Sequence, residues 1–342
     1  MSAARRRQAR PAASVLIPTL NEAEALPGLL SDLAAQQGLR FEVIVADGGS
    51  SDATVAIAQR HGATVIAAPR GRAAQFNAAI AAARAPWLIC LHADSRLTAP
   101  DQLAQGLARL RAEPGIVAGH WVLRFARAQT GHDLLFRQLQ AKSASNRAGT
   151  VNGDQGLVIH RDTLAALGGF DASLPFFEDQ RLAAKVFAQG RFLLLPGVIE
   201  TAARRFEVEG HRPRLLLMAL IVGAEAAGLE AWLASLPALY RAQSQATALS
   251  ITPFLRDLST HLRQLPKARQ RQVRCAVGAL LTANAWQLAL LMDTLSQRKS
   301  QQWLRRFDRR LAGLATRAPW PMLAGSLMMA GIHAAARLSK RA

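Results

Sequence analysis

The sequence predicts an α/β protein, with a mostly parallel sheet flanked by helices and followed by an all-helical, basic carboxyl-terminal region. Over the first 110 residues, short runs rich in Val, Ile and Leu alternate with helix-like segments. Such runs are typical of strands buried on both faces. Beyond residue 210 no strand-like run remains. Short turns between alternating strands and helices favour a doubly wound sheet with right-handed crossovers.

The elements of the first part follow from these runs. Asp52 is positioned to cap the second helix, and Pro100 with Asp101 to begin the fourth. We expect strands at 14–18, 41–46, 63–67 and 87–91, and helices at about 23–37, 52–61, 72–85 and 101–112.

The pattern loosens between residues 115 and 201. Gly168-Gly169 marks a turn before the last helix of this part. We expect a long strand at 115–125, a polar helix at 131–147, a strand at 155–160, a helix at 178–189 and short closing strands at 193–195 and 198–201.

Three largely apolar stretches lie further on, at 213–240, 275–292 and 318–336. Each is near the lower length limit of a membrane span and carries polar or helix-breaking residues. Three alternatives therefore stay open: packed helices of a soluble domain, helices lying in a membrane interface, and true spans.

Composition divides the chain into four segments. They are a basic disordered arm at 1–12, the sheet domain at 13–210, an amphipathic helical segment at 211–245 and a basic helical region at 246–342. The arm carries Arg5, Arg6, Arg7 and Arg10 with no apolar segment behind them, so we expect a solvated arm and not a signal peptide. Cys90 and Cys275 lie far apart, and we expect both to be buried and unpaired in a reducing compartment.

Positive charge is concentrated at the carboxyl end. The net charge is +19, and residues 246–342 hold sixteen Lys and Arg against three Asp, a net of +13. The apolar content of this region favours an anionic membrane surface over nucleic acid as its partner. Clusters at Arg305-Arg306, Arg309-Arg310 and Lys340-Arg341 suit lipid head groups. We therefore expect a cytoplasmic protein, peripheral on the inner face of the membrane, that binds no nucleic acid.

Acidic residues follow the predicted strands. Asp47 comes directly after the run 41–46, Asp94 comes three residues after 87–91, and Glu178-Asp179 opens a later helix. Since the carboxyl ends of parallel strands gather along one sheet edge, we expect these carboxylates to meet where such folds bind ligands.

The loops after the first two strands are candidates for nucleoside binding. Pro18, Thr19, Asn21 and Glu22 end the first strand, and Asp47 begins the turn Asp-Gly-Gly-Ser-Ser-Asp. Short polar side chains here could contact a nucleobase or ribose. The alternative is a strand end and a turn that caps the next helix.

An anion site is predicted at Arg70, Gly71 and Arg72, with Gln75 one turn further on. Two guanidinium groups beside a helix amino end provide charged donors and free backbone N–H groups. The alternative is a solvated basic loop. The pattern matches neither the ATP-binding Walker loop nor the dinucleotide fingerprint, which argues against an ATPase or a dehydrogenase.

His92 and Asp94 are the candidate metal ligands, because alternate residues of an extended chain point to the same side. Mg²⁺ or Mn²⁺ takes carboxylate and phosphate oxygens, and Mn²⁺ also accepts imidazole. Such an ion makes a diphosphate a better leaving group.

Asp179 or Glu178 is the candidate general base for an acceptor hydroxyl. The alternative is that both carboxylates only complement the helix dipole. Gly153, Asp154 and Gln155 are candidates for the acceptor pocket, and Arg204 and Arg205 for contacts with the diphosphate.

Five motifs in this order resemble those of family 2 glycosyltransferases. They are Pro18–Glu22, Asp47–Asp52, Arg70–Arg72, Leu91–Asp94 and Glu178-Asp179, within a resemblance that covers about residues 12–240. The Arg-Gly-Arg-x-x-Gln loop, Leu-His-Ala-Asp-Ser and Gly-Asp-Gln segments are most similar to a bacterial subgroup.

The resemblance implies a GT-A fold, a divalent cation and inverting transfer from a nucleotide sugar. It places Thr19, Glu22 and Asp47 on the nucleoside, Asp94 on the metal as part of an Asp-x-Asp motif, and Asp179 as the base. His92 departs from the family, which usually has an acidic residue there.

We therefore expect a glycosyltransferase that acts on a hydroxyl acceptor, for which a lipid-linked molecule is one hypothesis. A nucleotidyltransferase on a related sheet is one alternative, but it predicts a glycine-rich loop with a cation after the first strand, and Pro18–Glu22 has neither. A non-enzymatic basic protein that binds membrane or nucleic acid through its carboxyl third is the other.

Overall fold

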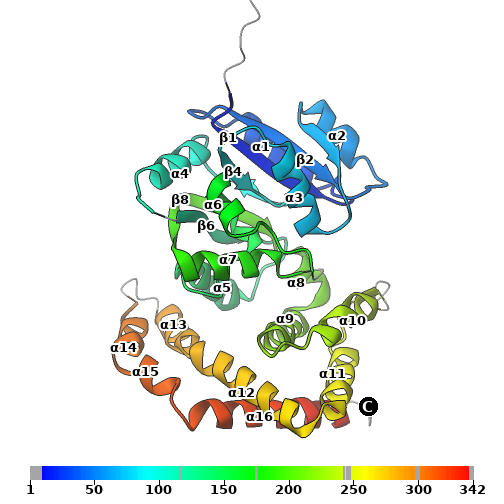
Figure 1. Ribbon diagram of the computed structural model, residues 1–342, viewed down its shortest axis with the longest axis vertical. Coiled ribbons are helices and arrows are strands. Elements are labelled where there is room, and N and C mark those ends of the chain that lie inside the picture. The colour runs from blue at the N-terminus through cyan, green and yellow to red at the C-terminus, as the bar shows by residue number, and fades with distance from the viewer. Residues whose placement is uncertain are drawn as a thin grey trace, which may run out of the picture. The chain divides into compact units, whose positions relative to one another are not determined.

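The computed structural model describes residues 10–115, 117–173, 176–241, 243, 248–296 and 301–338. Most of the predicted arm, including Arg5, Arg6 and Arg7, lies outside the described residues, as does Lys340-Arg341. The chain divides into two compact units (Figure 1). The first comprises residues up to Ala126 together with Leu139–Ala202, and the second comprises Arg127–Gln138 and the chain from Ala203 onward. The four segments expected from composition stay a prediction.

The first unit is built on an eight-stranded sheet. Its strands are β1 (Ala13–Thr19), β2 (Phe41–Asp47), β3 (Thr64–Ala67), β4 (Trp87–Cys90), β5 (Arg96–Leu97), β6 (Val117–Ala126), β7 (Leu157–His160) and β8 (Arg191–Ala202). Its helices are α1 (Leu26–Ala34), α2 (Thr54–Arg60), α3 (Arg72–Ala82), α4 (Gln102–Arg111), α6 (Arg161–Ala166) and α7 (Glu178–Gln189). Helix α5 (Asp133–Ala144) belongs partly to each unit, and a 3₁₀ turn spans Gly153–Gln155.

The predicted α/β class is confirmed, and the strand order is β3-β2-β1-β4-β7-β6-β8-β5. Strands β1 to β4 are parallel to their neighbours among themselves, and β6 is parallel to β8. Strand β7 runs antiparallel to both β4 and β6, and β5 antiparallel to β8, so the sheet is mixed. Strand β5 and helix α6 were not predicted.

The two closing strands expected at 193–195 and 198–201 are one strand, β8. A register shift against β6 between His120 and Val122 accommodates Pro196-Gly197. The indole of Trp121 donates to the Pro196 carbonyl oxygen at 3.0 Å. A bulge of this kind lets a strand contain a proline that would otherwise end it, which is why the pattern looked broken.

Both faces of the sheet are buried, as the apolar runs predict. Val15 and Ile17 of β1 belong to one core cluster, which includes side chains of α1 and α4. Leu16 belongs to the other cluster, with side chains of α3 and α7. Cys90 is buried in the second cluster, and burial raises the pKa of its thiol. Cys275 is exposed, so the prediction that both cysteines are buried is wrong for Cys275.

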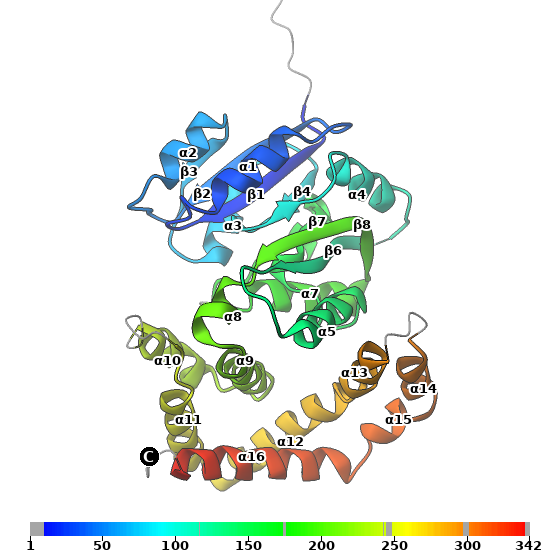
Figure 2. The ribbon, with the colours of Figure 1, turned by 180° about the vertical axis from the view of Figure 1, so that it is seen from behind.

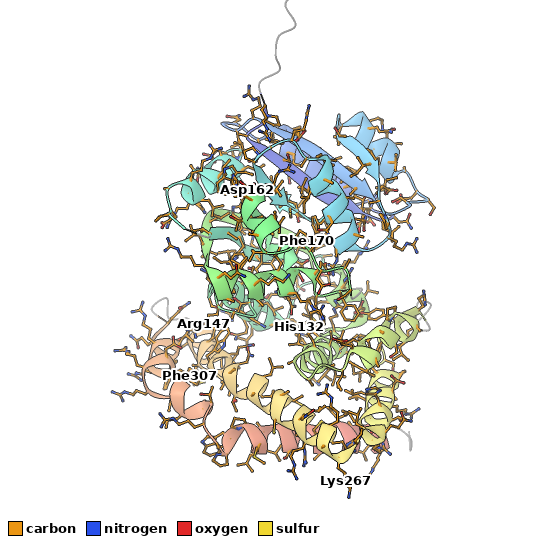
Figure 3. The ribbon with its side chains drawn as sticks, in the orientation of Figure 1. His132, Arg147, Asp162, Phe170, Lys267 and Phe307 are labelled. Carbon is orange, nitrogen blue, oxygen red and sulfur yellow. The ribbon has the colours of Figure 1, made fainter. Side chains whose placement is uncertain are left out.

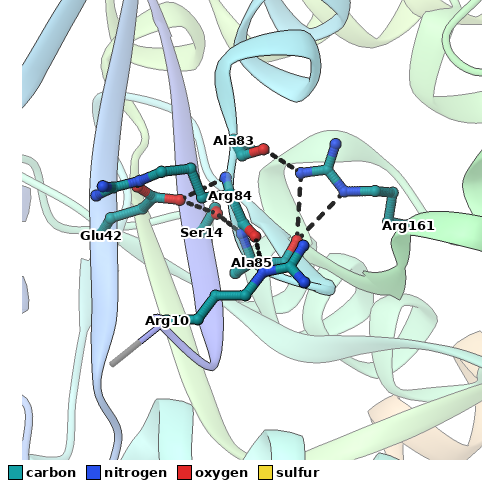
Figure 4. Close-up of polar contacts among 7 residues, drawn as sticks. All are labelled: Arg10, Ser14, Glu42, Ala83, Arg84, Ala85 and Arg161. Atoms are coloured by element: carbon teal, nitrogen blue, oxygen red, sulfur yellow. Dashed lines mark hydrogen bonds and ion pairs between the residues drawn. The ribbon is translucent and has the colours of Figure 1, made fainter. Parts of the chain in front are cut away.

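A polar network fixes the carboxyl end of α3 near the start of β1 and β2 (Figure 4). Glu42 accepts hydrogen bonds from the Ser14 hydroxyl at 2.6 Å and from Arg84 Nε at 2.8 Å. Arg161 donates to three carbonyl oxygens around the end of α3, those of Ile80, Ala83 and Ala85. A cation beside the last carbonyls of a helix satisfies acceptors that the helix leaves free.

The described residues of the second unit form helices joined by turns and loops, and none of them lies in a strand (Figure 2). Its helices are α8 (Arg204–Glu209), α9 (His211–Ala226), α10 (Glu230–Arg241), α11 (Thr252–Gln264), α12 (Lys267–Ala283), α13 (Trp286–Leu295), α14 (Gln302–Arg310), α15 (Ala312–Ala315) and α16 (Trp320–Leu338). Among the described residues, one stretch, Lys267–Leu295, is long and apolar enough to cross a membrane. One such stretch does not by itself establish a span.

Helices α12 and α16 touch backbone to backbone. A Cβ added at Gly278 would lie 1.7 Å from the Pro321 carbonyl oxygen, and one at Gly325 would lie 2.0 Å from the Arg274 carbonyl oxygen. Only glycine permits such an approach without moving a helix.

The Glu42 network makes a pH-dependent contribution to stability. Burial acts to raise the pKa of Glu42, but hydrogen bonds from Ser14 and Arg84 outweigh it and hold that pKa below its usual value of 4.5. The contribution is therefore present above pH 4.5 and is lost as the pH falls through the lower folded-state pKa. We predict that Glu42→Gln lowers the free energy of unfolding by about 2 kcal/mol at neutral pH. Urea denaturation should show this difference shrinking in acid, whereas Glu230→Gln, at an exposed position, should change little; an equal loss at both pH values would contradict the prediction.

The glycine contact of α16 can be tested within one helix. Gly325→Ala should destabilise the protein by about 2 kcal/mol, because the new methyl group meets the backbone of α12. Gly331, on the same helix, has open space around its Cα, so Gly331→Ala should stabilise by up to about 1 kcal/mol. Thermal melting followed by circular dichroism measures both, and effects of the same sign would refute the close packing.

Candidate functional site

The predicted acidic positions do meet at one edge of the sheet. In the parallel pair β1 and β2, Thr19 is paired with Asp47, so both strands end together. Strand β4 ends beside them, and His92 and Asp94 follow it. Because β7 is antiparallel to β4, the 3₁₀ turn that precedes β7 comes to the same edge.

Asp47 is held by its own turn. Its Oδ2 accepts from the backbone N–H groups of Gly49 at 3.0 Å and Ser50 at 2.9 Å. Its Oδ1 accepts from the hydroxyls of Ser50 at 2.5 Å and Thr19 at 3.3 Å. Burial acts to raise the pKa of Asp47, but these hydrogen bonds lower it below its usual value, so the group is a carboxylate. The structure therefore shows Asp47 in the structural role of a turn residue. A ligand that contacted its carboxylate would have to share the oxygens that already accept these hydrogen bonds.

The loop after β1 is tied to the loop after β2. Asn21 has a left-handed backbone, with φ of 56°, and its Oδ1 accepts from Ser51 N at 2.8 Å. The backbone N–H of Glu22 donates to the Thr54 hydroxyl at 2.8 Å. Asp52 was predicted to cap α2, but the N-cap residue is Ala53, and Asp52, one residue earlier, accepts from Thr54 N at 3.0 Å. The loop that contains Asn21 and Glu22 is therefore held in place before any ligand binds.

Pro18 and Gln75 are both buried at the ends of the first strands. Strand β1 runs through Pro18 to Thr19, so the expectation that it stops at the proline is wrong. At Pro18 the pairing with β4 has already ended, which suits a residue that has no N–H. The Gln75 amide donates to the carbonyl oxygens of Thr19 at 2.7 Å and Ala46 at 2.8 Å, so it joins the ends of β1 and β2.

Arg72 lies among carboxylates at the start of α3. Its Nε is 2.7 Å from Oε1 of Glu178, which is buried at the start of α7. Burial acts to lower the pKa of Arg72, but the charges of Glu178, Asp179, Asp154 and Asp94 raise it. Burial also raises the pKa of Glu178, against the charge of Arg72.

The residues before Arg72 form a short exposed turn. Gly71 is the residue before α3, and its φ of 128° is one that side chains rarely tolerate. Arg70 is exposed. The predicted Arg-Gly-Arg loop therefore stands at the amino end of α3, where helices offer free N–H groups to anions. Binding of an anion there stays a prediction.

A second group of contacts joins His92 to the 3₁₀ turn and to α7. His92 Nδ1 lies 2.9 Å from an Asp154 carboxylate oxygen. The Gly153 backbone N–H donates to Asp179 Oδ2 at 2.5 Å, and Asp179 Oδ1 accepts from Gln180 N at 2.7 Å. A Cβ at Gly153 would lie 2.6 Å from His92 Nε2 and 3.1 Å from Asp179 Oδ2, so only glycine fits here. Gly153 and Asp154 thus position His92 and Asp179.

His92 and Asp94 have the donor atoms that a divalent cation would take. His92 Nε2 is buried and has no hydrogen-bond partner among the residues that the structure describes. Metal-ligating imidazoles commonly bond a carboxylate through the other nitrogen, as Nδ1 does here. Asp94 Oδ2 accepts from the Thr201 hydroxyl at 3.0 Å. Within the described part of the chain no three His, Cys, Asp or Glu side chains are grouped to hold an ion, so further oxygens would have to come from a ligand.

A small pocket adjoins Asp179. Its volume is about 20 Å³, which is enough for about one water molecule. Most of its lining is apolar, and Phe170 on its wall is labelled in Figure 3. Gly153 and Asn152 form its polar end with Asp179.

The remaining predicted residues are placed elsewhere. Gln155 is buried and donates to the Thr150 carbonyl oxygen at 2.5 Å, so its amide is part of the turn. Arg204 and Arg205 are exposed at the start of α8 in the second unit. Two contributors were missed: Thr201, which bonds Asp94, and Asn152, which accepts from Gln180 at 3.0 Å. Neither has a local signal, because each partner is distant in sequence.

The model of the family described as glycosyl transferase family 2 matches residues 14–155, the segment that holds most of these residues. This segment is a family 2 glycosyltransferase domain. The resemblance noted in the sequence is confirmed at the level of the family. The mixed α/β sheet agrees with the fold class predicted, and the GT-A type is what the family resemblance implies.

Two curated relatives are also named glycosyltransferases. An uncharacterized glycosyltransferase of Mycobacterium tuberculosis is 34% identical over 118 residues, covering 32% of this chain and 52% of the relative. A PGL/p-HBAD biosynthesis glycosyltransferase of Mycobacterium bovis is 35% identical over 125 residues, covering 34% of this chain and 49% of the relative. The chain thus spans about half the length of the curated relatives it matches.

Among solved structures, a mannosyltransferase from Pyrobaculum calidifontis in complex with GDP-Man and Mn²⁺ aligns with a TM-score of 0.47. The two are 20% identical, and the alignment covers 97% of this chain and 87% of that one.

Proposed function

We propose that the protein is an inverting glycosyltransferase that moves a sugar from a nucleotide diphosphate sugar to an acceptor hydroxyl. The observation that carries the proposal is the placement of Asp179. This carboxylate borders a pocket and acts electrostatically on Arg72, which belongs to the segment that the family 2 model matches.

The donor would lie across the ends of β1 and β2. Thr19, Asn21, Glu22 and Asp47 would contact the nucleoside, because their loops are already tied together. The serine and threonine hydroxyls around Asp47 can rotate to share its carboxylate with a base N–H.

Arg72, with Arg70 and the free N–H groups at the start of α3, would bind the diphosphate. Glu178 would then hold the Arg72 guanidinium in place instead of taking a proton, since it is buried and ion-paired. Of the two carboxylates predicted as catalytic, only Asp179 borders the pocket. Contacts of Arg204 and Arg205 with the diphosphate stay a prediction.

The charge at the site supports a divalent cation. Glu178, Asp179, Asp154 and Asp94 all act on Arg72, so carboxylates outnumber this guanidinium four to one. A diphosphate would add further negative charge, and like charges brought together repel. His92 Nε2 and Asp94 would hold Mn²⁺ or Mg²⁺, which when bound stabilises the charge that develops on the departing diphosphate.

The reaction would proceed by a single displacement. The acceptor oxygen attacks the anomeric carbon, its proton passes to Asp179 Oδ, and the bond between that carbon and the diphosphate oxygen breaks. Hydrogen bonds from Gly153 N and Gln180 N orient the Asp179 carboxylate for this transfer. Gly153 and Asp154 would border the acceptor, while Gln155 supports their turn.

The assignment of Asp179 can be tested once a panel of UDP- and GDP-sugars has identified a donor. Asp179→Asn should lower kcat about a hundredfold or more, because a general base typically contributes that much. Binding of the nucleoside diphosphate should change little. Asp162→Asn is the matched control, since Asp162 is exposed on α6 (Figure 3).

Glu178→Gln should instead raise KM for the donor more than it lowers kcat, because it releases Arg72. Wild-type turnover by Asp179→Asn would refute the base, and a product that keeps the anomeric configuration of the donor by NMR would refute inversion.

A further inference from the structure

Exposed apolar side chains are concentrated in the last part of the second unit. Twelve of the sixteen large hydrophobic residues that are exposed among the described residues lie between Leu288 and Leu338. They include Trp303, Leu311, Leu314, Trp320, Leu323 and Leu327.

Helix α16 is apolar on two opposite faces. Its buried face consists of Gly325, Met329, Ile332 and Ala336, at spacings of three and four residues. The outward face contains Trp320, Leu323 and Leu327, which are 57%, 50% and 75% exposed. A helix that is apolar all round is expected inside a large core or in a lipid environment.

Helix α14, which precedes α16 in the chain with α15 between them, adds positive charge. Residues 301–338 contain six arginines and one acidic residue, Asp308, a net of +5. Arg305, Arg306, Arg309 and Arg310 are exposed on α14. The Arg306 guanidinium lies 5.3 Å from the centroid of the Trp303 ring. Tryptophan and arginine together are typical of the boundary between lipid and water.

We propose that these residues form a docking surface for an anionic lipid bilayer. The α14–α16 surface consists of Trp303, Leu311, Leu314, Trp320, Leu323 and Leu327 with Arg305, Arg306, Arg309 and Arg310. The apolar side chains enter the interface and the arginines bind lipid phosphates. The sequence predicted that the arginine clusters of this surface contact lipid, and the structure adds the exposed apolar side chains of the same region.

Other occupants fit the surface less well. A second copy would bring the same +5 charge against this one, which is unfavourable. Nucleic acid would use the arginines but leave a row of leucines in water. A spanning α16 would need lipid on all sides, yet its other face packs on α12, and His333 Nδ1 lies 2.9 Å from the Ser259 hydroxyl of α11. A position in the lipid interface agrees with the positive charge, with the exposed apolar side chains and with the packed inner face of α16.

The docking surface goes beyond the proposed transfer reaction and does not depend on it. None of its residues is among those proposed to bind donor, metal or acceptor. Donor hydrolysis in solution therefore reports on the transfer reaction alone, and vesicle binding reports on the surface alone.

The test is co-flotation of the full chain with vesicles of phosphatidylcholine, either alone or mixed with phosphatidylglycerol. The wild type should float with the anionic vesicles, and added salt should weaken the binding. The triple variant Trp320→Ala, Leu323→Ala, Leu327→Ala should bind the anionic vesicles at least about tenfold more weakly, because it removes the apolar contacts. Leu216→Ala is the matched control, since Leu216 is an exposed leucine of α9, and should float as the wild type does.

A double charge variant tests the electrostatic component of binding separately. Arg305→Gln with Arg306→Gln should weaken binding to anionic vesicles while leaving the circular dichroism spectrum unchanged. Equal flotation of wild type and triple variant would overturn the proposal, as would equal binding to neutral and anionic vesicles. Dimers in solution that the triple variant dissociates would assign the surface to a second copy and also overturn it.

Discussion

The ion pair between Arg72 and Glu178 is the interaction on which the candidate site depends. It joins the first residue of α3 to the first residue of α7, two helices that begin at the same edge of the sheet. Glu178 is buried, so removing Arg72 would leave an uncompensated charge in the protein interior, which is costly. The pair also sets the charge of the surroundings, because Asp94, Asp154 and Asp179 act on the same guanidinium.

Excess negative charge at this edge has a chemical consequence. Four carboxylates around Arg72 repel a further anion, yet the proposed reaction requires a diphosphate to bind there. A cation that binds together with the donor resolves the conflict. His92 fits this account, because its Nδ1 is engaged by Asp154 while Nε2 has no partner among the described residues.

Much of this could be predicted from the sequence, because it depends on local pattern. The runs that form β1, β2 and β4, and the acidic residues after them, follow from strand periodicity and parallel topology. Helix α7 begins and ends where the sequence indicated. Contacts between distant segments could not be predicted in this way. Gln75 reaches two strand ends, Thr201 bonds Asp94 across 107 residues, and His92 meets Asp154 across 62. The His92 contact depends on the antiparallel insertion of β7, and the Thr201 contact on the course of β8 after its bulge. The Gln75 contacts depend on how α3 packs against the ends of β1 and β2. None of these features has a periodic signal.

Calorimetric titration of the protein with UDP and GDP, with Mn²⁺ and in its absence, tests the charge account most directly. Wild-type protein should bind one of them at least about tenfold more tightly with Mn²⁺, since the ion offsets repulsion from the carboxylates. Asp94→Asn should remove most of this difference while leaving the fold intact. If UDP and GDP each bound with the same affinity in EDTA as in Mn²⁺, this would contradict the claim that the cluster needs a cation to accept a diphosphate.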